Sequence, residues 1–327
     1  VHDCILQNGF IGVSTGYNLQ GTTNVSIYRN SIRYVNWGVQ CGSEAAGSTI
    51  SNLQIYGNTI SDFANWDEPA TNNHHHNGIF VWTNNSDTSN ACTGLRIYGN
   101  TIGPGFGTFA TSGIYISAPG HRSETLIYNN VMLSTGSNPT NGDIFVVPGP
   151  GATTRIYNNT FVGSQGIAIG YGGDHGGAQS LIIRNCIVKG TGKIAVHVSY
   201  GTLVTINSDH NIWYGLSGSP AGFSISANSS ASFRTFAQWQ ALGYDLNSDY
   251  EVNPLLDSNG RLQAGSPAID AGEDLSAYFT TDYDSSTRVT PWDVGAFDRD
   301  GISGGSPATT VSPLGHRASR GFIGCAF

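Results

Sequence analysis

Acidic residues stand beside two apolar stretches of the chain. Asp67 and Glu68 come shortly before Gly78–Trp82, and Asp143 opens the stretch Asp143–Val147. Glycoside hydrolysis needs two carboxyl groups flanking the scissile bond, about 5–5.5 Å apart for retention and about 6.5–9.5 Å apart for inversion. Strands of one sheet lie about 4.8 Å apart, so carboxylates on adjacent or next-adjacent strands fall in this range. Asp67 or Glu68 paired with Asp143 is therefore our candidate for a hydrolytic site.

A second set of residues suits β-elimination. A polysaccharide lyase needs a base for the proton α to a uronic carboxylate, and a cation or Arg that neutralises this carboxylate. His76, Arg122, Lys193 and Tyr115 have the chemistry for these roles, with Asp or Glu side chains holding Ca²⁺. Hydrolysis requires no cofactor, and Ca²⁺ is the one cofactor that the lyase alternative would add.

Three consecutive histidines, His74, His75 and His76, precede the first apolar stretch. Consecutive residues of an extended segment cannot all face one ion, so only His74 and His76 could share a metal. A catalytic or sugar-binding His76 and a solvated loop are the alternatives. The following Asn77-Gly78 favours His76 as the ordered member.

Further along the chain, Tyr171, Asp174 and His175 belong to the Gly-rich segment YGGDHGG, and His197 belongs to a later apolar stretch. We assign all four to substrate binding. Asp174-His175 is a weak signal, because its flanking glycines also fit a plain turn.

A repeat must position these residues. The segment LRIYGNTI (Leu95–Ile102) recurs with one Asn fixed in place, as in LQIYGNTI at Leu53–Ile60 and TRIYNNTF at Thr154–Phe161. The aligned asparagines are Asn8, Asn30, Asn58, Asn100, Asn130, Asn159, Asn185 and Asn211. Repeats of 20 to 50 residues with one fixed polar residue are typical of a solenoid.

The residues three before and two after each Asn are apolar and should point inward. These pairs are Ile27/Ile32, Ile55/Ile60, Ile97/Ile102, Ile127/Met132, Ile156/Phe161 and Ile182/Ile187. A second strand with period two follows each turn. With Ile79, Ile114 and Ile144 inward, alternation turns a set of mostly aromatic residues outward: Phe80, Trp82, Tyr115, Phe145 and Val147. Such a row suits the apolar faces of sugar rings; alternatively, loops fold over the rings as a small core.

This pattern resembles the right-handed parallel β-helix of the pectin-lyase-like superfamily. The resemblance implies an all-β solenoid of about eight coils over residues 1–215, with an Asn ladder at one turn. It also implies that the long segments on either side of Gly78–Trp82, residues 61–77 and 83–94, form walls of a substrate groove. The paired-Asp, Gly-His-Gly and Arg-x-Lys patterns of polygalacturonase-like hydrolases are absent, as is the Trp-Ile-Asp-His pattern of pectate lyases.

After Asn211 the repeat fades. Residues 216–300 should form a cap with one helix at Ser230–Asp245, N-capped by Ser232, and residues 301–327 read as a Ser/Pro/Gly-rich tail. The segments Asn253–Asp274 and Asp282–Asp298 resemble the C-terminal part of secreted bacterial β-helix proteins. The resemblance gives Asp270, Arg288 and Asp293 structural roles and implies an extracellular protein, although the chain contains no signal peptide.

Composition limits the partners. The net charge is −8 and no basic run exists, so nucleic acid is not expected as a partner. No stretch of 18 apolar residues is present, so no membrane span is expected. Val1 lies inside the first coil, so we expect a trimmed N-terminus. We expect a monomer or one module of a larger chain.

The sequence therefore predicts a secreted, carbohydrate-active protein that acts on an extended polysaccharide. Hydrolysis is the first hypothesis and β-elimination the second. A non-catalytic glycan-binding or adhesin module is the alternative from another class.

Overall fold

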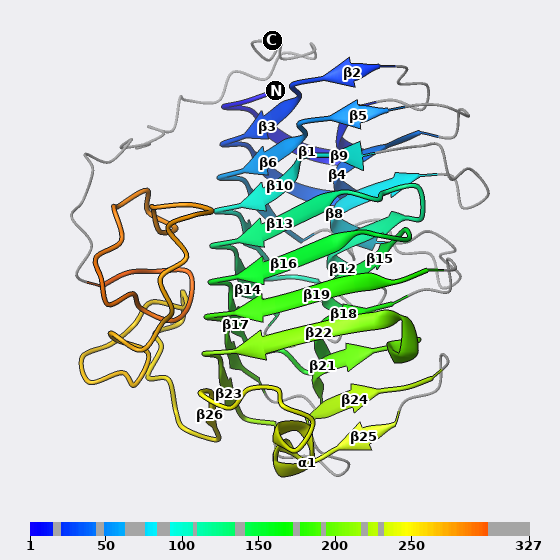
Figure 1. Ribbon diagram of the computed structural model, residues 1–327. Helices are drawn as coiled ribbons and strands as arrows, with labels where there is room; N and C mark the ends of the chain where they lie inside the picture. Colours follow the sequence, from blue (N-terminus) through cyan, green and yellow to red (C-terminus); the bar gives the residue numbers. More distant parts are fainter. Residues whose placement is uncertain are drawn as a thin grey trace.

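The chain winds into a parallel β-solenoid of about six turns, rather than the eight that the sequence predicted. The computed structural model describes residues 1–15, 21–43, 49–62, 76–83, 92–106, 110–134, 141–172, 177–190, 194–216, 222–227 and 232–299. Successive coils stack from the N-terminal end to the α1 end, and the C-terminal segment lies along one side (Figure 1). Among the described residues, no helix is long and apolar enough to cross a membrane.

A seven-stranded parallel sheet leads into the asparagine turn of each coil. Its strands in spatial order are β3 (Ser26–Tyr28), β6 (Gln54–Tyr56), β10 (Leu95–Tyr98), β13 (Glu124–Tyr128), β16 (Thr153–Tyr157), β19 (Gln179–Arg184) and β22 (Val204–Asp209). Short strands extend this side in the first coils as a second, three-stranded sheet: β2 (Thr22–Thr23), β5 (Ile50–Ser51) and β9 (Cys92–Thr93).

A sixteen-stranded sheet follows the asparagine turn and has two parts. The part next to the turn is called here the β14 face. It comprises β7 (Thr59–Ser61), β11 (Thr101–Ile102), β14 (Val131–Leu133), β17 (Thr160–Val162), β20 (Ile187–Lys189), β23 (Ile212–Tyr214) and β26 (Asp249–Tyr250).

The other part is called the β15 face. It comprises β8 (His76–Thr83), β12 (Ala110–Ala118), β15 (Gly142–Pro148), β18 (Ile167–Tyr171), β21 (Ile194–Val198), β24 (Phe223–Ile225) and the antiparallel β25 (Phe233–Arg234). The long strands β1 (Ile5–Ser14) and β4 (Ser31–Ser43) run through both faces. One 3₁₀ turn, Gly201–Leu203, precedes β22.

A ladder of buried side chains closes the turn between β13 and β14 and its equivalents. The backbone N–H of Asn58 donates to Asn100 Oδ1 at 3.0 Å, and its Nδ2 donates to the same oxygen at 3.0 Å. Asn100 repeats both bonds with Asn130, at 3.1 and 2.9 Å. Each side-chain amide thus provides a hydrogen-bond partner for the backbone and the amide of the preceding turn. The ladder therefore stabilises a tight turn inside a dry core.

Two expected members are not in the ladder. Asn185 lies one residue before it, and Cys186 takes the rung, with its N–H donating to Asn211 Oδ1 at 2.8 Å. At the first coil the rung is Cys4, whose N–H donates to Asn30 Oδ1 at 3.1 Å, whereas Asn8 is exposed in β1. The inward pair of that late coil is accordingly Ile183/Val188 instead of Ile182/Ile187.

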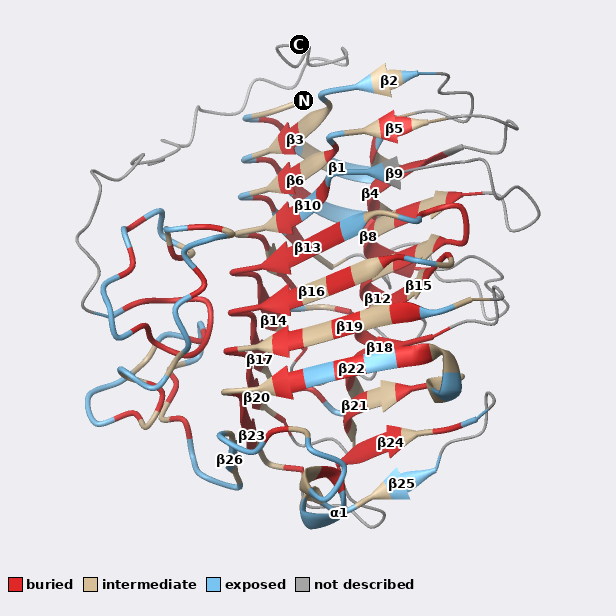
Figure 2. Ribbon diagram, viewed as in Figure 1, coloured by how far each residue is buried: buried red, intermediate tan, exposed pale blue. Residues whose placement is uncertain are grey.

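The core is a continuous stack of aliphatic side chains inside the coils. Ile55, Ile97 and Ile127 pair in register and are fully buried, as are Ile79, Ile114 and Ile144 on the other side. Figure 2 shows buried residues on the strands throughout the stack of coils. Stacked identical side chains bury a large apolar area in each coil, and this burial is the main driving force of the fold.

The helix that covers the end of the solenoid is shorter than predicted. It spans Phe236–Gln240 (α1), and its N-cap is Thr235, which forms a capping box with Gln238. Phe233 belongs to β25 instead. Trp239 is fully buried and its Nε1 donates to Asp245 Oδ2 at 2.6 Å.

The same carboxylate terminates the ladder. Asp245 Oδ1 accepts from Asn211 Nδ2 at 2.8 Å and from Ser248 Oγ at 2.6 Å, while Oδ2 also accepts from Ser208 Oγ at 2.8 Å. The last amide of the stack is therefore satisfied by the cap.

The C-terminal segment, residues 253–299, packs along the outer edge of the asparagine turns (Figure 1). A second row of asparagines holds it: each stands one residue before a ladder position and has a left-handed backbone. Asn129 Nδ2 donates to Thr281 O at 2.7 Å, and Asn158 Nδ2 donates to Asp293 O and Gly295 O, both at 3.0 Å.

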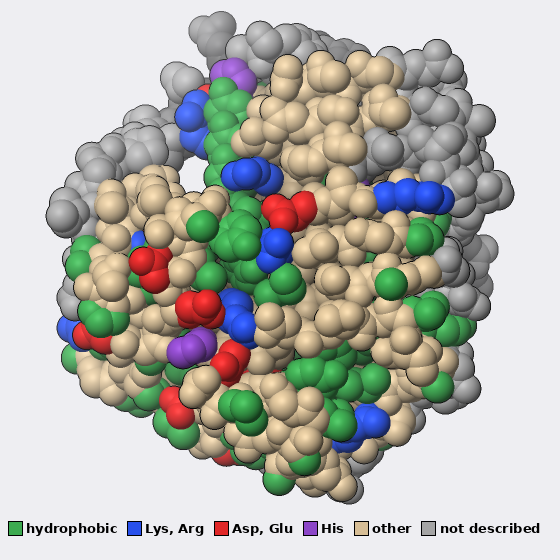
Figure 3. Space-filling model, in the orientation of Figure 1, with side chains coloured by type: hydrophobic (Ala, Val, Ile, Leu, Met, Phe, Trp, Pro, Cys, Tyr) green, Lys and Arg blue, Asp and Glu red, His purple; other side chains and the backbone are tan. Residues whose placement is uncertain are grey.

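Arg288 and Asp293 are buried in this segment, in keeping with the structural roles expected for them. The Arg288 guanidinium donates to Asn129 Oδ1 and Gly295 O at 2.9 and 2.8 Å. Asp293 accepts from the backbone N–H of Asp270 at 2.8 Å. Figure 3 shows charged side chains scattered along the border between this segment and the seven-stranded sheet, with an apolar strip beside them.

Candidate functional site: an aromatic row on the β15 face

Five aromatic side chains follow one another across successive strands on the outside of the solenoid. They are Phe10 in β1, Trp37 in β4, Phe80 in β8, Tyr115 in β12 and Phe145 in β15. Their ring centroids are 5.4, 5.8, 5.3 and 5.6 Å apart in that order. The set is called the aromatic row. From Phe80 to Phe145 it follows the strand register along the axis of the solenoid, whereas Trp37 pairs with Asn77, three residues before Phe80.

On β8, β12 and β15, alternation turns three members of the row outward, as the sequence predicted. Phe80, Tyr115 and Phe145 pair in register and are half-buried, while Ile79 and Val81 beside them are buried. An outward residue on a parallel strand has an outward neighbour in the next coil, so aromatic residues at one position become a continuous strip.

Trp82 widens the row. Its ring centroid lies 6.3 Å from that of Phe80. The indole lies over Gly42 of the preceding coil, where a Cβ would come within 2.3 Å of the Trp82 ring. Phe145 leans in the same way over Gly170, where a Cβ would lie 2.4 Å from its ring. Glycine in these two neighbours therefore lets the rings lie flat against the sheet.

His197 lies beyond the row on the same face, in register with Gly170. It is half-buried, and its Nδ1 has no hydrogen-bond partner within the described ranges. Burial lowers the pKa of His197. A neutral imidazole is both a donor and an acceptor, so it suits a hydroxyl group better than an ionic partner.

Asp143 does not lie beside the row. Strand register puts it next to Gly113 in one neighbouring coil and Ala168 in the other, at a position that faces the core. It is fully buried, and its Oδ1 accepts from Ser134 Oγ at 2.5 Å. Oδ2 has no partner in the part of the chain that the structure describes.

Burial raises the pKa of Asp143 to about 7, and the hydrogen bond from Ser134 opposes this rise. Such a pKa is common for catalytic acids. Here it results from desolvation inside the solenoid, where a polysaccharide on the outer face cannot reach. Asp143 therefore cannot serve in the predicted carboxylate pair.

Tyr171 also points inward. It is fully buried, its hydroxyl donates to Ser180 O at 3.3 Å, and burial raises its pKa. His76 is buried at the start of β8, in register with Ala110, so it does not present its ring to the row. Arg122 is exposed in the turn after β12, and His121 beside it is buried against Thr125.

Several candidates lie outside the described residues: Asp67, Glu68, His74, His75, Asp174, His175 and Lys193. No group of three or more metal-binding side chains occurs among the residues that are described. The site that the structure does bring together is thus Phe80, Trp82, Tyr115 and Phe145, with His197 further along.

Phe10 and Trp37 were missed by sequence reasoning. Both lie in β1 and β4, which pair in register as Ile11 with Trp37. Trp37 stands two residues before the buried Val39, so period-two alternation would place it on the inward side of β4, and the pattern did not point to it.

No protein-family model matches the chain, and no curated protein matches it. The fold is therefore established by the coordinates, and the function has to be argued from the site.

Proposed function

We propose that this chain binds an extended polysaccharide along the aromatic row. The observation that carries the proposal is the spacing: the centroids of five rings on successive strands are 5.3 to 5.8 Å apart on the outside of the solenoid. A polysaccharide presents apolar C–H faces at regular intervals, and aromatic rings with polar neighbours are well suited to contact them.

Resemblance in the sequence supports the same class. The repeat with its Asn turn resembles the pectin-lyase-like superfamily, whose members handle polysaccharides on such solenoids, and the C-terminal segment resembles secreted bacterial β-helix proteins. We therefore include secretion and membership of this superfamily in the proposal.

The first test is a binding assay with two matched double variants. Phe80→Ala/Tyr115→Ala removes two rings of the row, and Tyr56→Ala/Tyr98→Ala removes two stacked, half-buried rings from the seven-stranded sheet. Affinity electrophoresis would be run against neutral and acidic polysaccharides. We expect the first variant to lose roughly tenfold or more in affinity, because a buried aromatic contact contributes about 1.5–3 kcal/mol.

The control variant should bind like the unmodified protein. Equal retention of both variants, or no retention of the unmodified protein by any polysaccharide, would refute the proposal. Melting curves of both variants would show that each is folded.

Hydrolysis is a second candidate, favoured by the place of Asp67 and Glu68 in the chain. They belong to residues 63–75, which join β7 to β8, the strand that carries Phe80 and Trp82. Incubation with a polysaccharide panel, with and without EDTA, would be followed by reducing ends and by the ultraviolet absorbance of unsaturated products. New reducing ends without absorbance, lost in Asp67→Asn or Glu68→Gln, would indicate hydrolysis. Absorbance would indicate β-elimination. If neither signal appears, the chain is a binding module.

A further inference from the structure

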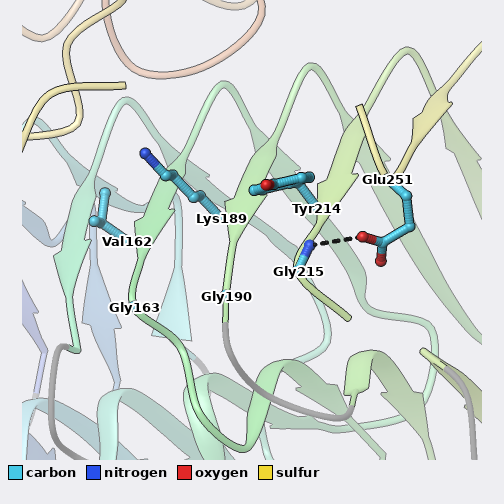
Figure 4. A pocket seen from close by; sticks show the side chains of 7 residues that line it. All are labelled: Val162, Gly163, Lys189, Gly190, Tyr214, Gly215 and Glu251. Atoms are coloured by element: carbon cyan, nitrogen blue, oxygen red, sulfur yellow. Dashed lines mark hydrogen bonds between the residues drawn. The ribbon is translucent and has the colours of Figure 1, made fainter. Parts of the chain in front are cut away.

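A cavity of about 530 Å³ opens on the β14 face, away from the aromatic row. Its wall is formed by residues that pair in register on β17, β20 and β23: Val162, Lys189 and Tyr214. Glu251 continues this line after β26 (Figure 4). The cavity is called the Lys189 pocket.

Glycines make room for the pocket. Gly163, Gly190 and Gly215 directly follow the three wall residues in successive coils and line the cavity. Gly215 has a φ of +75°, and a Cβ there would lie 2.0 Å from Gly190 O. The space beside the wall is therefore bounded by backbone, which lets a ligand approach the strands closely.

Two opposite charges stand in this pocket. Lys189 Nζ donates to Leu256 O at 3.2 Å, and an ammonium has two more donors. Glu251 Oε2 accepts from Gly215 N at 3.2 Å, and Oε1 accepts from Leu216 N at 2.9 Å. These backbone bonds fix the carboxylate, while each oxygen retains a further lone pair for a ligand.

Tyr214 lies between the two charges. It pairs with Lys189 across β20 and β23, and its ring stands between Lys189 and Glu251 in Figure 4. The ring is half-buried, so it offers an apolar surface together with a hydroxyl group.

The charges select the kind of ligand. An anion at Tyr214 would be attracted by Lys189 and repelled by Glu251, and a cation the reverse, so a single charge gains little from the pair. A neutral polyhydroxyl compound satisfies both, because each hydroxyl group donates to the carboxylate or accepts from the ammonium. We propose that the Lys189 pocket binds a residue of a neutral saccharide, with Tyr214 against its apolar face.

This is a second site on another face, and it does not depend on the aromatic row. Its test therefore uses variants that separate the two. Calorimetric titration would use cellohexaose, xylohexaose and mannohexaose as neutral probes, and hexagalacturonate as the acidic probe. The variants are Tyr214→Ala and Glu251→Gln in the pocket, and Phe80→Ala/Tyr115→Ala in the row.

Arg33→Met is the matched control, because Arg33 lies on the same outward line of the β14 face, several coils away, and bonds to Gln7. We expect at least one neutral probe to lose tenfold or more in affinity in both pocket variants, and to be unaffected in Arg33→Met. Unchanged binding in the pocket variants overturns the proposal, even if the row variant loses binding. Preference of the pocket for hexagalacturonate, or no binding of any probe, overturns it as well.

Lysine labelling gives a direct readout at the site. The sequence contains only two lysines, Lys189 and Lys193. Acetic anhydride would be applied with and without the neutral probe, and acetylation measured by mass spectrometry relative to the N-terminal amine. We expect the bound probe to slow acetylation of Lys189 at least threefold in the unmodified protein and to leave it unchanged in Tyr214→Ala. Equal acetylation of Lys189 with and without a probe that binds would overturn the proposal.

Discussion

Asp143 is a carboxyl group at a position that neighbouring coils fill with glycine or alanine. Gly78, Gly113 and Ala168 stand beside it or in line with it in the stack. The interior cannot solvate a charge, so the protonated form is favoured and the pKa rises to about 7. The stability of the fold therefore depends on pH through this residue.

The direction in which pH changes the stability follows from the pKa of Asp143 in the folded and the unfolded chain. In the unfolded chain an Asp has a pKa of about 3.9, so between about pH 4 and 7 the folded state holds one proton more than the unfolded state. The stability that the neutral carboxyl group provides is complete below this window and is lost as the pH rises through about 7. The loss is on the order of 4 kcal/mol, because one pKa unit corresponds to about 1.4 kcal/mol.

We predict that Asp143→Asn removes this part of the pH dependence. The amide keeps an oxygen for Ser134 and does not titrate, so the difference in melting temperature between pH 4.5 and 8 should be smaller than in the unmodified protein. Thermal unfolding monitored by circular dichroism would measure it. The same substitution at the exposed Asp249 is the control. Identical pH profiles for Asp143→Asn and the unmodified protein would contradict the prediction.

At the scale of the elements, the asparagine ladder sets the register of every coil. Cys186 interrupts it. Its thiol donates weakly to Ile156 O and Arg184 O at 3.4 and 3.5 Å, where Asn159 donates to the equivalent carbonyls at 2.9 and 3.0 Å. Burial also raises the pKa of the Cys186 thiol to about 12, so it remains uncharged.

We predict that Cys186→Asn stabilises the protein by about 1 kcal/mol. The amide would supply an oxygen to the N–H of Asn159, as Asn159 does for Asn130, and would replace weak sulfur bonds with amide bonds. Chemical denaturation would measure the change. Cys186→Ala, which removes the side-chain bonds and leaves a cavity, should be less stable than the unmodified protein. A destabilised Cys186→Asn would show that this coil lacks space for the amide.

The sequence predicted those strands whose position follows from the local pattern of apolar residues alone. Apolar residues three before and two after the Asn fix two strands in most coils, and the outward alternation fixes Phe80, Tyr115 and Phe145. The prediction that Asn185 belongs to the ladder was wrong, because the cysteine after it occupies the ladder position in that coil. Helical spacing was also a wrong guide at Phe233. Its segment pairs with β24 instead of joining α1, because tertiary contacts override local helical spacing.

The candidate site was predicted only in part for a similar reason. Asp143 was visible as an unusual residue at the start of a strand, but its inward direction was not, because alternation from the inward Ile144 would turn it outward. The Lys189 pocket was not found at all. It depends on side chains from three coils and on a loop carboxylate, which no single repeat shows.

At the scale of the whole molecule, outer asparagines hold the C-terminal segment against three successive coils. Asn129, Asn158 and Asn185 contact this segment, while the equivalent residues of the coils before them are Gly57 and Gly99. Both residue types accept a left-handed backbone, but only Asn provides bonds to a covering chain. An Asn one residue before the ladder position is therefore a sequence signal for the docking of this segment.

We predict that Asn158→Gly loosens the C-terminal segment and leaves the solenoid intact. Glycine keeps the backbone angle and removes two bonds to Asp293 O and Gly295 O, a loss of about 1–3 kcal/mol. Hydrogen exchange measured by mass spectrometry should become faster in peptides from residues 253–299 and stay unchanged in β16 and β19. Gly99→Asn is the reciprocal control, because it adds an outer asparagine where the glycine already has a left-handed backbone, at a φ of +60°. Equal protection of the segment in Asn158→Gly and the unmodified protein would mean that apolar packing by Phe279 and Trp292 holds it alone.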